Sequence, residues 1–206
     1  MRVESILDLV GNTPVIGIHT LSPNKNIKIY LKLEGQNPGG SIKDRAAVSM
    51  IEAAEKSGEL KAGGTVLESS SGNTAIGLAL VCKLKGYHLV IVLSENVTTE
   101  RKELLKSYGA EIIYSDGSKG SNGAIAKAKE VKKENPDWIL LYQYGNSANV
   151  DAHYKTTGPE ILKDIPEIDV FAAGLGTSGT LMGVSKFFKE NKPEVKVVAV
   201  EPPVGE

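Results

Sequence analysis

One lysine of this 206-residue chain lies where its amine could act as a nucleophile. Lys43 follows the turn-rich stretch Asn37-Pro38-Gly39-Gly40-Ser41-Ile42 and opens an expected helix that Ser41 can cap. The positive end of a helix dipole disfavours a cation in the first turn, so we expect a lowered pKa for Lys43, partly offset by Asp44. A neutral amine attacks aldehydes, whereas most lysines at helix starts are simply solvated. The neighbouring motifs must decide between these two roles.

A serine-rich turn supplies a second set of chemically useful groups. The stretch Glu68-Ser69-Ser70-Ser71-Gly72-Asn73-Thr74-Ala75 follows an apolar run and opens an expected helix. Backbone N–H groups and hydroxyls at such a turn form a cradle for an anion, for example a substrate α-carboxylate. Asn73 could also hydrogen-bond a hydroxyl or oxide of a cofactor. An ordinary capped turn explains the same residues equally well.

A glycine-rich turn, Gly174-Leu175-Gly176-Thr177-Ser178-Gly179-Thr180, also lies between an apolar run and a helical pattern. Its position and glycine content predict a phosphate cradle. No lysine follows Gly179, which excludes a Walker A loop. Gly174, Gly176 and Gly179 do satisfy G-x-G-x-x-G, and Glu201 at the end of the next strand could contact a ribose. An NAD-type oxidoreductase or binding domain is therefore an alternative, and tight packing without a ligand is a third.

A glutamine follows another apolar run, in Tyr142-Gln143-Tyr144-Gly145-Asn146-Ser147-Ala148-Asn149. Gln143 could donate to the same carboxylate as the serine-rich turn. An amide at a strand end more often satisfies backbone groups, so this motif carries weight only beside the others.

The elements that must hold these motifs alternate between strand and helix. Apolar runs that suit buried strands cover residues 27–33, 65–68, 89–93, 111–114, 138–141, 170–173 and 195–200. Helical patterns cover residues 41–56, 74–85, 98–108, 122–134, 150–163 and 180–189, and residues 115–123 are expected to form a surface loop. This alternation predicts an α/β fold with a mainly parallel, doubly covered sheet, whose ligands bind at the carboxyl ends of the strands.

Composition narrows the choice of partner. Lys and Arg number 24 and Asp and Glu number 25, so the net charge of -1 gives no reason to expect nucleic acid or an anionic membrane as partner. The single cysteine, Cys82, lies in an apolar helical pattern, which predicts packing in the core and favours a reducing, cytoplasmic setting. No signal peptide or spanning apolar run is visible, and the three histidines lie too far apart in sequence to predict a metal site. We therefore expect a small-molecule partner and no metal.

The four motifs, in this order, resemble the β-family or fold-type II group of pyridoxal-phosphate enzymes, which includes cysteine synthase and cystathionine β-synthase. Further stretches extend the resemblance over essentially the whole chain, namely residues 10–14, 32–34, 99–102, 108–111, 158–160 and 198–202. Residues 142–149, 158–160 and 174–183 look most similar to the cysteine synthase B or O-phosphoserine sulfhydrylase branch.

The resemblance implies a role for each motif. Lys43 would hold pyridoxal 5′-phosphate as a Schiff base, and Asn73 would contact the ring oxygen of the cofactor. The cofactor phosphate would lie among Gly176, Thr177, Ser178, Gly179 and Thr180. The substrate carboxylate would be bound by Ser70, Ser71, Gly72, Thr74 and Gln143.

The resemblance also implies an activity and an architecture. The activity is a β-replacement that makes L-cysteine from O-acetylserine or O-phosphoserine and a sulfide donor, in a homodimer. The architecture is two three-layer, doubly wound, mainly parallel-sheet domains: a smaller mobile domain over residues 47–149 and a larger cofactor-binding domain over residues 1–46 and 150–206. Family members continue beyond the equivalent of Glu206, so we expect the larger domain to be incomplete. A noncatalytic truncated homologue is therefore a further hypothesis.

Overall fold

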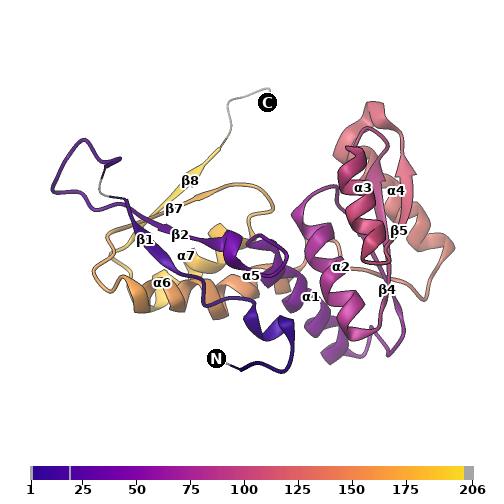
Figure 1. Ribbon diagram of the computed structural model, residues 1–206, viewed down its shortest axis with the longest axis horizontal. Coiled ribbons are helices and arrows are strands. Elements are labelled where there is room, and N and C mark those ends of the chain that lie inside the picture. Colours follow the sequence, from indigo (N-terminus) through magenta and orange to yellow (C-terminus); the bar gives the residue numbers. More distant parts are fainter. Residues whose placement is uncertain (1, 19, 202–206) are drawn as a thin grey trace. The chain divides into compact units, whose positions relative to one another are not determined.

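A computed structural model describes residues 2–18 and 20–201 of the chain (Figure 1). The chain forms two compact units, one comprising Met1–Ile42 with Asn149–Glu206 and the other Lys43–Ala148. We call them the split unit and the central unit. No helix among the described residues is both long and apolar enough to cross a bilayer.

The central unit is built on a four-stranded parallel sheet in the order β5-β4-β3-β6. The strands are β3 (Thr65–Ser69), β4 (His88–Ser94), β5 (Glu111–Ser115) and β6 (Ile139–Leu140). The helices are α1 (Lys43–Ser57), α2 (Asn73–Lys85), α3 (Thr99–Ser107) and α4 (Gly120–Glu134), with a short 3-10 turn at Gly117–Lys119. Parallel strands need helical crossovers, so this arrangement follows from the strand and helix alternation of the sequence.

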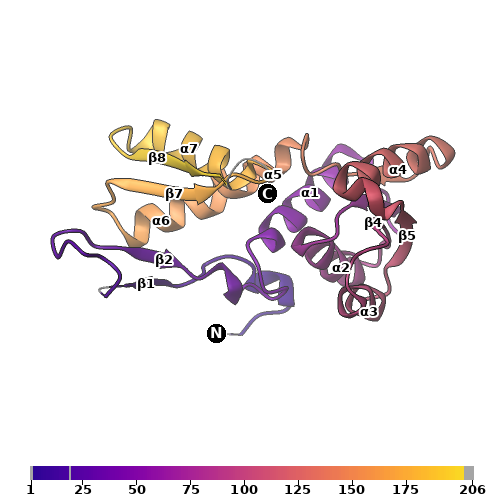
Figure 2. The same ribbon diagram turned by 90° about the horizontal axis from the view of Figure 1, so that it is seen from above.

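The two faces of this sheet are covered by different helices. Leu67, Val90 and Val92 pack against Ala128 and other residues of α4 on one face. Figure 2 shows α4 on that side of the sheet and α2 and α3 on the other. Because successive strand residues point to opposite faces, the side chain of Glu68 points away from α4. The central unit therefore has three layers.

The split unit contains two short sheets among its described residues. Strands β1 (Val15–Gly17) and β2 (Tyr30–Lys32) are antiparallel, and β7 (Val170–Gly174) and β8 (Lys196–Val200) are parallel. Its other elements are two 3-10 turns (Ile6–Leu9 and Glu34–Gln36), a π-helical segment (His153–Thr157), α6 (Gly158–Asp164) and α7 (Gly179–Asn191), and α5 (Ser147–Ala152) leads into it. Ile161, Val184, Phe188 and Val195 form its apolar core.

The α/β class and the mainly parallel strands are confirmed, and three details differ from expectation. Strand β1 was not expected, because its apolar run is only three residues long. Residues 150–163 form two α-helices joined by a π-helical segment rather than one regular helix. Part of the expected loop over residues 115–123 is helical, because the Asp116 side chain caps the 3-10 turn by accepting the Ser118 N–H at 2.9 Å.

Candidate functional site

Lys43 and Asn73 open two helices that lie side by side in the central unit. Gly77 of α2 packs so closely on α1 that a Cβ on it would lie 3.1 Å from both the Ala47 Cβ and an Asp44 carboxylate oxygen. This contact holds the first turns of α1 and α2 together. Burial lowers the pKa of the Lys43 amine. The direction of the pKa shift is the expected one, and desolvation by burial accounts for it.

The serine-rich turn and Gln143 meet in the same unit. The Thr74 hydroxyl donates to the Gln143 side-chain oxygen at 2.6 Å, and both residues are buried. Arg101 of α3 donates to the Ser71 carbonyl at 2.7 Å, and the Ser70 hydroxyl accepts the Gly72 N–H at 3.3 Å. The structure thus brings together the residues expected to bind a carboxylate.

Gln143 is placed by a strained turn after β6. The Leu141 N–H donates to the Leu67 carbonyl at 3.1 Å, which keeps the chain beside β3 as far as that residue. Tyr142 then adopts a φ of 53°, in the left-handed region that non-glycine residues rarely occupy. The Gly145 N–H donates to the Tyr142 carbonyl at 3.0 Å and closes the turn. A strained residue directly before Gln143 is typical of a position fixed for function.

A buried carboxylate, Glu68, lies beneath both loops, and its sequence motif did not indicate a role for it. Glu68 is fully buried, and its carboxylate accepts the Ser69 N–H at 2.9 Å and the Gln143 N–H at 3.1 Å. Burial raises the pKa of Glu68 to about 7, although hydrogen bonds from neighbouring backbone groups oppose the shift. A carboxylate inside an apolar β-strand was the available sequence signal for a special environment.

The glycine-rich turn belongs to the split unit and joins β7 to α7. Ser178 has a φ of 67° and Gly179 begins the helix. A Cβ on Gly179 would lie 2.2 Å from the Asn149 side-chain oxygen, so only glycine fits, and the Asn149 amide donates to the Thr177 hydroxyl at 3.1 Å. No atom lies within 4 Å of where a Cβ on Gly176 would be. The turn is therefore fixed on one side and open on the other.

His153 supports the same turn from the π-helical segment, a role that its sequence context did not indicate. The side chain is fully buried. Its Nδ1 lies 3.0 Å from the Thr157 hydroxyl, and its Nε2 lies 3.3 Å from the Thr180 hydroxyl. Such π-helical insertions are frequent at functional sites.

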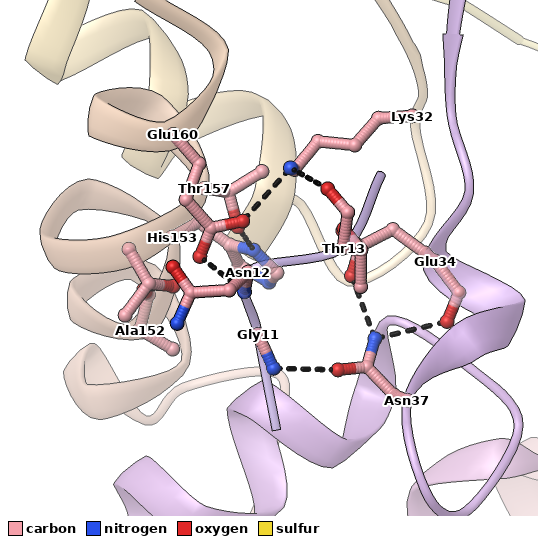
Figure 3. A network of polar contacts seen from close by, with 11 residues as sticks. Gly11, Asn12, Thr13, Lys32, Glu34, Asn37, Ala152, His153, Thr157 and Glu160 are labelled. Atoms are coloured by element: carbon pink, nitrogen blue, oxygen red, sulfur yellow. Dashed lines mark hydrogen bonds and ion pairs between the residues drawn. The ribbon is translucent and has the colours of Figure 1, made fainter. Parts of the chain in front are cut away.

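A polar network in the split unit anchors the N-terminal segment (Figure 3). Lys32 forms a largely buried ion pair with Glu160, with a distance of 2.8 Å between Nζ and Oε2 and side-chain exposures of 10% and 13%. Lys32 also donates to the Thr13 carbonyl at 2.9 Å, and the other Glu160 oxygen accepts the Asn12 N–H at 3.0 Å. Three motifs that the resemblance left without a role, residues 10–14, 32–34 and 158–160, therefore meet here.

The network continues to the loop that leads into Lys43. Glu34 accepts the Thr13 hydroxyl at 2.6 Å and the Asn37 amide at 2.9 Å (Figure 3). The Asn37 side-chain oxygen accepts the Gly11 N–H at 2.8 Å, and the Asn37 carbonyl accepts the Gly40 N–H at 2.8 Å. Asn37, the first residue of the Lys43 motif, is thus fixed by side-chain contacts on both its oxygen and its nitrogen.

A cavity of about 260 Å³ lies elsewhere in the central unit, lined by Cys82, His88 and Tyr108 among others. His88 begins β4, whereas Ser69 ends the parallel strand β3, so the cavity and the serine-rich turn lie at opposite ends of the strands. Burial raises the pKa of the Cys82 thiol to about 12. The prediction that Cys82 is a packing residue is confirmed. Within the described residues, no three His, Cys, Asp or Glu side chains gather in a way that could hold a metal ion.

Comparison with known proteins places the chain. Residues 6–205 match the family model described as pyridoxal-phosphate dependent enzyme. A cysteine synthase of Staphylococcus aureus is 47% identical over 202 residues, covering 97% of this chain and 65% of that protein. The chain thus spans slightly less than two thirds of the length of this relative. The dinucleotide-binding alternative gains no support from these matches.

Solved structures agree with this placement. The crystal structure of a cysteine synthase from Entamoeba histolytica superposes with a TM-score of 0.93 at 38% identity, covering 98% of this chain and 61% of that chain. An O-acetylserine dependent cystathionine β-synthase from Helicobacter pylori gives 0.92 at 36% identity, covering 98% and 67%. The fold is therefore that of fold-type II enzymes, present in part. The chain belongs to the family of pyridoxal-phosphate dependent enzymes.

Proposed function

We propose that this chain carries the catalytic lysine of a pyridoxal-phosphate dependent enzyme that makes L-cysteine from an O-activated serine and a sulfide donor. One observation carries the proposal: Lys43 opens α1 beside the start of α2, and burial lowers the pKa of its amine. A lysine must be neutral to attack an aldehyde, and burial favours the neutral amine. The identity of 47% to a cysteine synthase supports the choice of reaction.

The residues of the glycine-rich turn fit a phosphate group. A side chain at Gly174 or Gly176 would project into open space, which a bound group can occupy instead. The first N–H groups of α7 have no partners within the helix and favour an anion. The Thr177 and Thr180 hydroxyls are oriented by Asn149 and His153. We assign the phosphate to residues 176–180 and the ring oxygen to Asn73.

The residues of the chain have separate roles in the proposed reaction. Pyridoxal phosphate, when bound, supplies an electron sink that stabilises negative charge at the α-carbon of an amino acid. Lys43 Nζ would hold the cofactor, and its free amine would take the α-proton as general base. Ser70, Ser71, Gly72, Thr74 and Gln143 bind the α-carboxylate and orient the Cα–H bond. Closure of the smaller domain, residues 47–149, excludes water during the reaction.

The lysine assignment is tested by incubating the protein with pyridoxal phosphate, reducing with borohydride and mapping the labelled peptide. We expect a covalent adduct at Lys43 in the wild-type chain and none in Lys43→Ala. Lys56→Ala is the matched control, because Lys56 is exposed at the other end of α1 and should leave labelling unchanged. Absence of an adduct at Lys43, or equal labelling of Lys43→Ala, would overturn the proposal.

The substrate, assembly and location extend the same proposal. We infer that the substrate is O-acetylserine or O-phosphoserine, and steady-state rates with each, measured at equal sulfide, separate them. We infer a homodimer from the family resemblance, and light scattering during gel filtration tests it. The single buried cysteine is consistent with a cytoplasmic setting.

A further inference from the structure

One carboxylate, that of Glu68, connects the start of the serine-rich turn to the start of the loop that contains Gln143. Glu68 accepts the N–H of Ser69, which starts the serine-rich turn, and the N–H of Gln143, which lies 75 positions further along the chain. The two distances are 2.9 and 3.1 Å, both typical of good hydrogen bonds. No salt-bridge partner for Glu68 exists among the described residues, so its charge is met by hydrogen bonds, chiefly from the backbone of Ser69 and Gln143.

The same two loops are joined a second time at the side-chain level. Thr74 Oγ1 donates to Gln143 Oε1 at 2.6 Å. Glu68 and Thr74, at the two ends of the serine-rich turn, therefore both contact Gln143. Tyr142 supplies the left-handed backbone turn that directs the Gln143 N–H toward Glu68.

In the described part of the chain, no charged side chain on the neighbouring elements offsets the negative charge of Glu68. Helix α1 brings Lys43, Asp44 and Arg45 in its first turn. The charges of α2 lie in its last turn, at Lys83 and Lys85, and the His88 of β4 lies at the start of that strand. Strand β6 has no titratable residue, and α4 covers the opposite face of the sheet. None of these side chains contributes to the raised pKa of Glu68, which burial causes.

A buried carboxylate without a cation is costly, and an apolar residue would fill the space at less cost. The carboxylate offers a separate oxygen to each of the two N–H groups, whereas an amide would present its NH₂ to one of them. We propose that Glu68 is a positioning residue. It fixes the serine-rich turn and Gln143 relative to each other, so that both can bind the substrate carboxylate. This inference rests on the proposed function, since it deepens the role of the carboxylate-binding loops.

The first test needs no cofactor. In the ¹⁵N-labelled wild-type chain, the Ser69 and Gln143 amide resonances should titrate together with one midpoint near pH 7. Glu68→Gln should abolish that shared titration, because the glutamine side chain does not titrate. Independent midpoints, or a titration that survives Glu68→Gln, would overturn the inference. The wild-type measurement decides the matter even if the variant fails to fold.

The second test measures the carboxylate selectivity of the chain loaded with pyridoxal phosphate. L-Serine and serinol are the probes, since serinol replaces the carboxylate by a hydroxymethyl group. We expect Glu68→Gln to reduce the preference for L-serine by roughly tenfold, the effect of losing one good hydrogen bond to a charged group. Glu55→Gln is the matched control, because its carboxylate binds Lys85 and Tyr87 at the far end of α1.

An unchanged preference in folded Glu68→Gln, or an equal loss in Glu55→Gln, would overturn the inference. So would a wild-type chain that binds L-serine no better than serinol. These outcomes are distinct from failure of the proposed function, which labelling of Lys43 decides by itself. If Lys43 forms no adduct, the amide titration still shows whether Glu68 couples the two loops.

Discussion

Two buried carboxylates, one in each unit, differ in their partners: one is paired with a cation and the other is not. Glu160 in the split unit faces the Lys32 ammonium at 2.8 Å and also accepts the Asn12 N–H. Glu68 in the central unit accepts two backbone N–H groups and has no cation, and burial raises its pKa to about 7. Burial raises the pKa of a carboxylate when no cation compensates for the lost solvation, and this is the situation of Glu68.

This contrast distinguishes a carboxylate of the structural framework, Glu160, from a carboxylate of the candidate site, Glu68. The ion pair of Lys32 and Glu160 connects the N-terminal segment to α6, and the network continues through Glu34 to Asn37 (Figure 3). Glu68 lies directly under loops that must meet a substrate. A protein can keep a costly, uncompensated charge where its position serves function, while structural charges are neutralised by partners.

The largest effect should come from breaking the paired carboxylate. Lys32→Met leaves Glu160 largely buried without its cation, and we expect a loss of about 3 kcal/mol in the free energy of unfolding. Lys32→Met combined with Glu160→Met should recover much of that loss, because no charge remains buried. Urea titration measures both. Lys127→Met, which removes an exposed pair with Glu130, is the control and should change little. Equal losses in Lys32→Met and Lys127→Met would show that the pair is not structural.

An effect of similar size should appear as a pH dependence at the unpaired carboxylate. The pKa of Glu68 is raised from 4.5 to about 7, so the folded state holds this proton more tightly than the unfolded state. The stability that Glu68 contributes is complete below pH 4.5 and is lost as pH rises through 7. That change amounts to about 3 kcal/mol, at about 1.4 kcal/mol per pKa unit.

Glu68→Gln should remove this slope, so the cost of the substitution should be smaller at pH 8 than at pH 5. The free energy of unfolding of both proteins, measured by urea titration from pH 5 to 8, checks this. Parallel pH profiles for the two proteins would mean that Glu68 titrates at its ordinary pKa.

The pattern of strands and helices was largely predictable, because the strands of the central unit are built around short apolar runs. The strand β4 and the stop of α2 at Gly86, with a φ of 75°, follow directly from side-chain type. The π-helical segment at His153–Thr157 was not predictable. Its register depends on tertiary contacts, such as that of His153 with Thr180, which leave no periodic signal.

The site was predictable as a set of motifs and not as a set of contacts. Lys43, Thr74 and Gln143 could be selected by type and position, and the structure joins the last two by a hydrogen bond. The functions of Glu68 and Asn149 depend on partners far along the chain, which a single sequence does not reveal. The non-glycine residues with positive φ, which are Asn12, Tyr142 and Ser178 among the described residues, all lie within selected motifs.

The distinction between framework and site should also hold inside the glycine-rich turn. Gly179→Ala places a Cβ against Asn149, so we expect a loss of about 2 kcal/mol in stability as well as weaker binding of pyridoxal phosphate. Gly176→Ala meets no atom within 4 Å, so stability should be unchanged while binding of the phosphate group weakens. Thermal unfolding and a titration with pyridoxal phosphate measure the two properties. Pyridoxal, which lacks the phosphate, is the control ligand, and equal weakening for both ligands would contradict the assignment of this turn.

The smallest effect should come from backbone strain beside the ion pair. Asn12 has a φ of 47°, and its N–H donates to Glu160. Glycine adopts this conformation freely and keeps the N–H, so Asn12→Gly should leave stability within about 0.5 kcal/mol of the wild type. Asn12→Val should cost more, roughly 1 to 2 kcal/mol, because a β-branched residue is strained at positive φ. If urea titration instead shows equal losses for both variants, the Asn12 side chain and not its backbone holds this turn, and the framework around Glu160 extends further than its hydrogen bonds indicate.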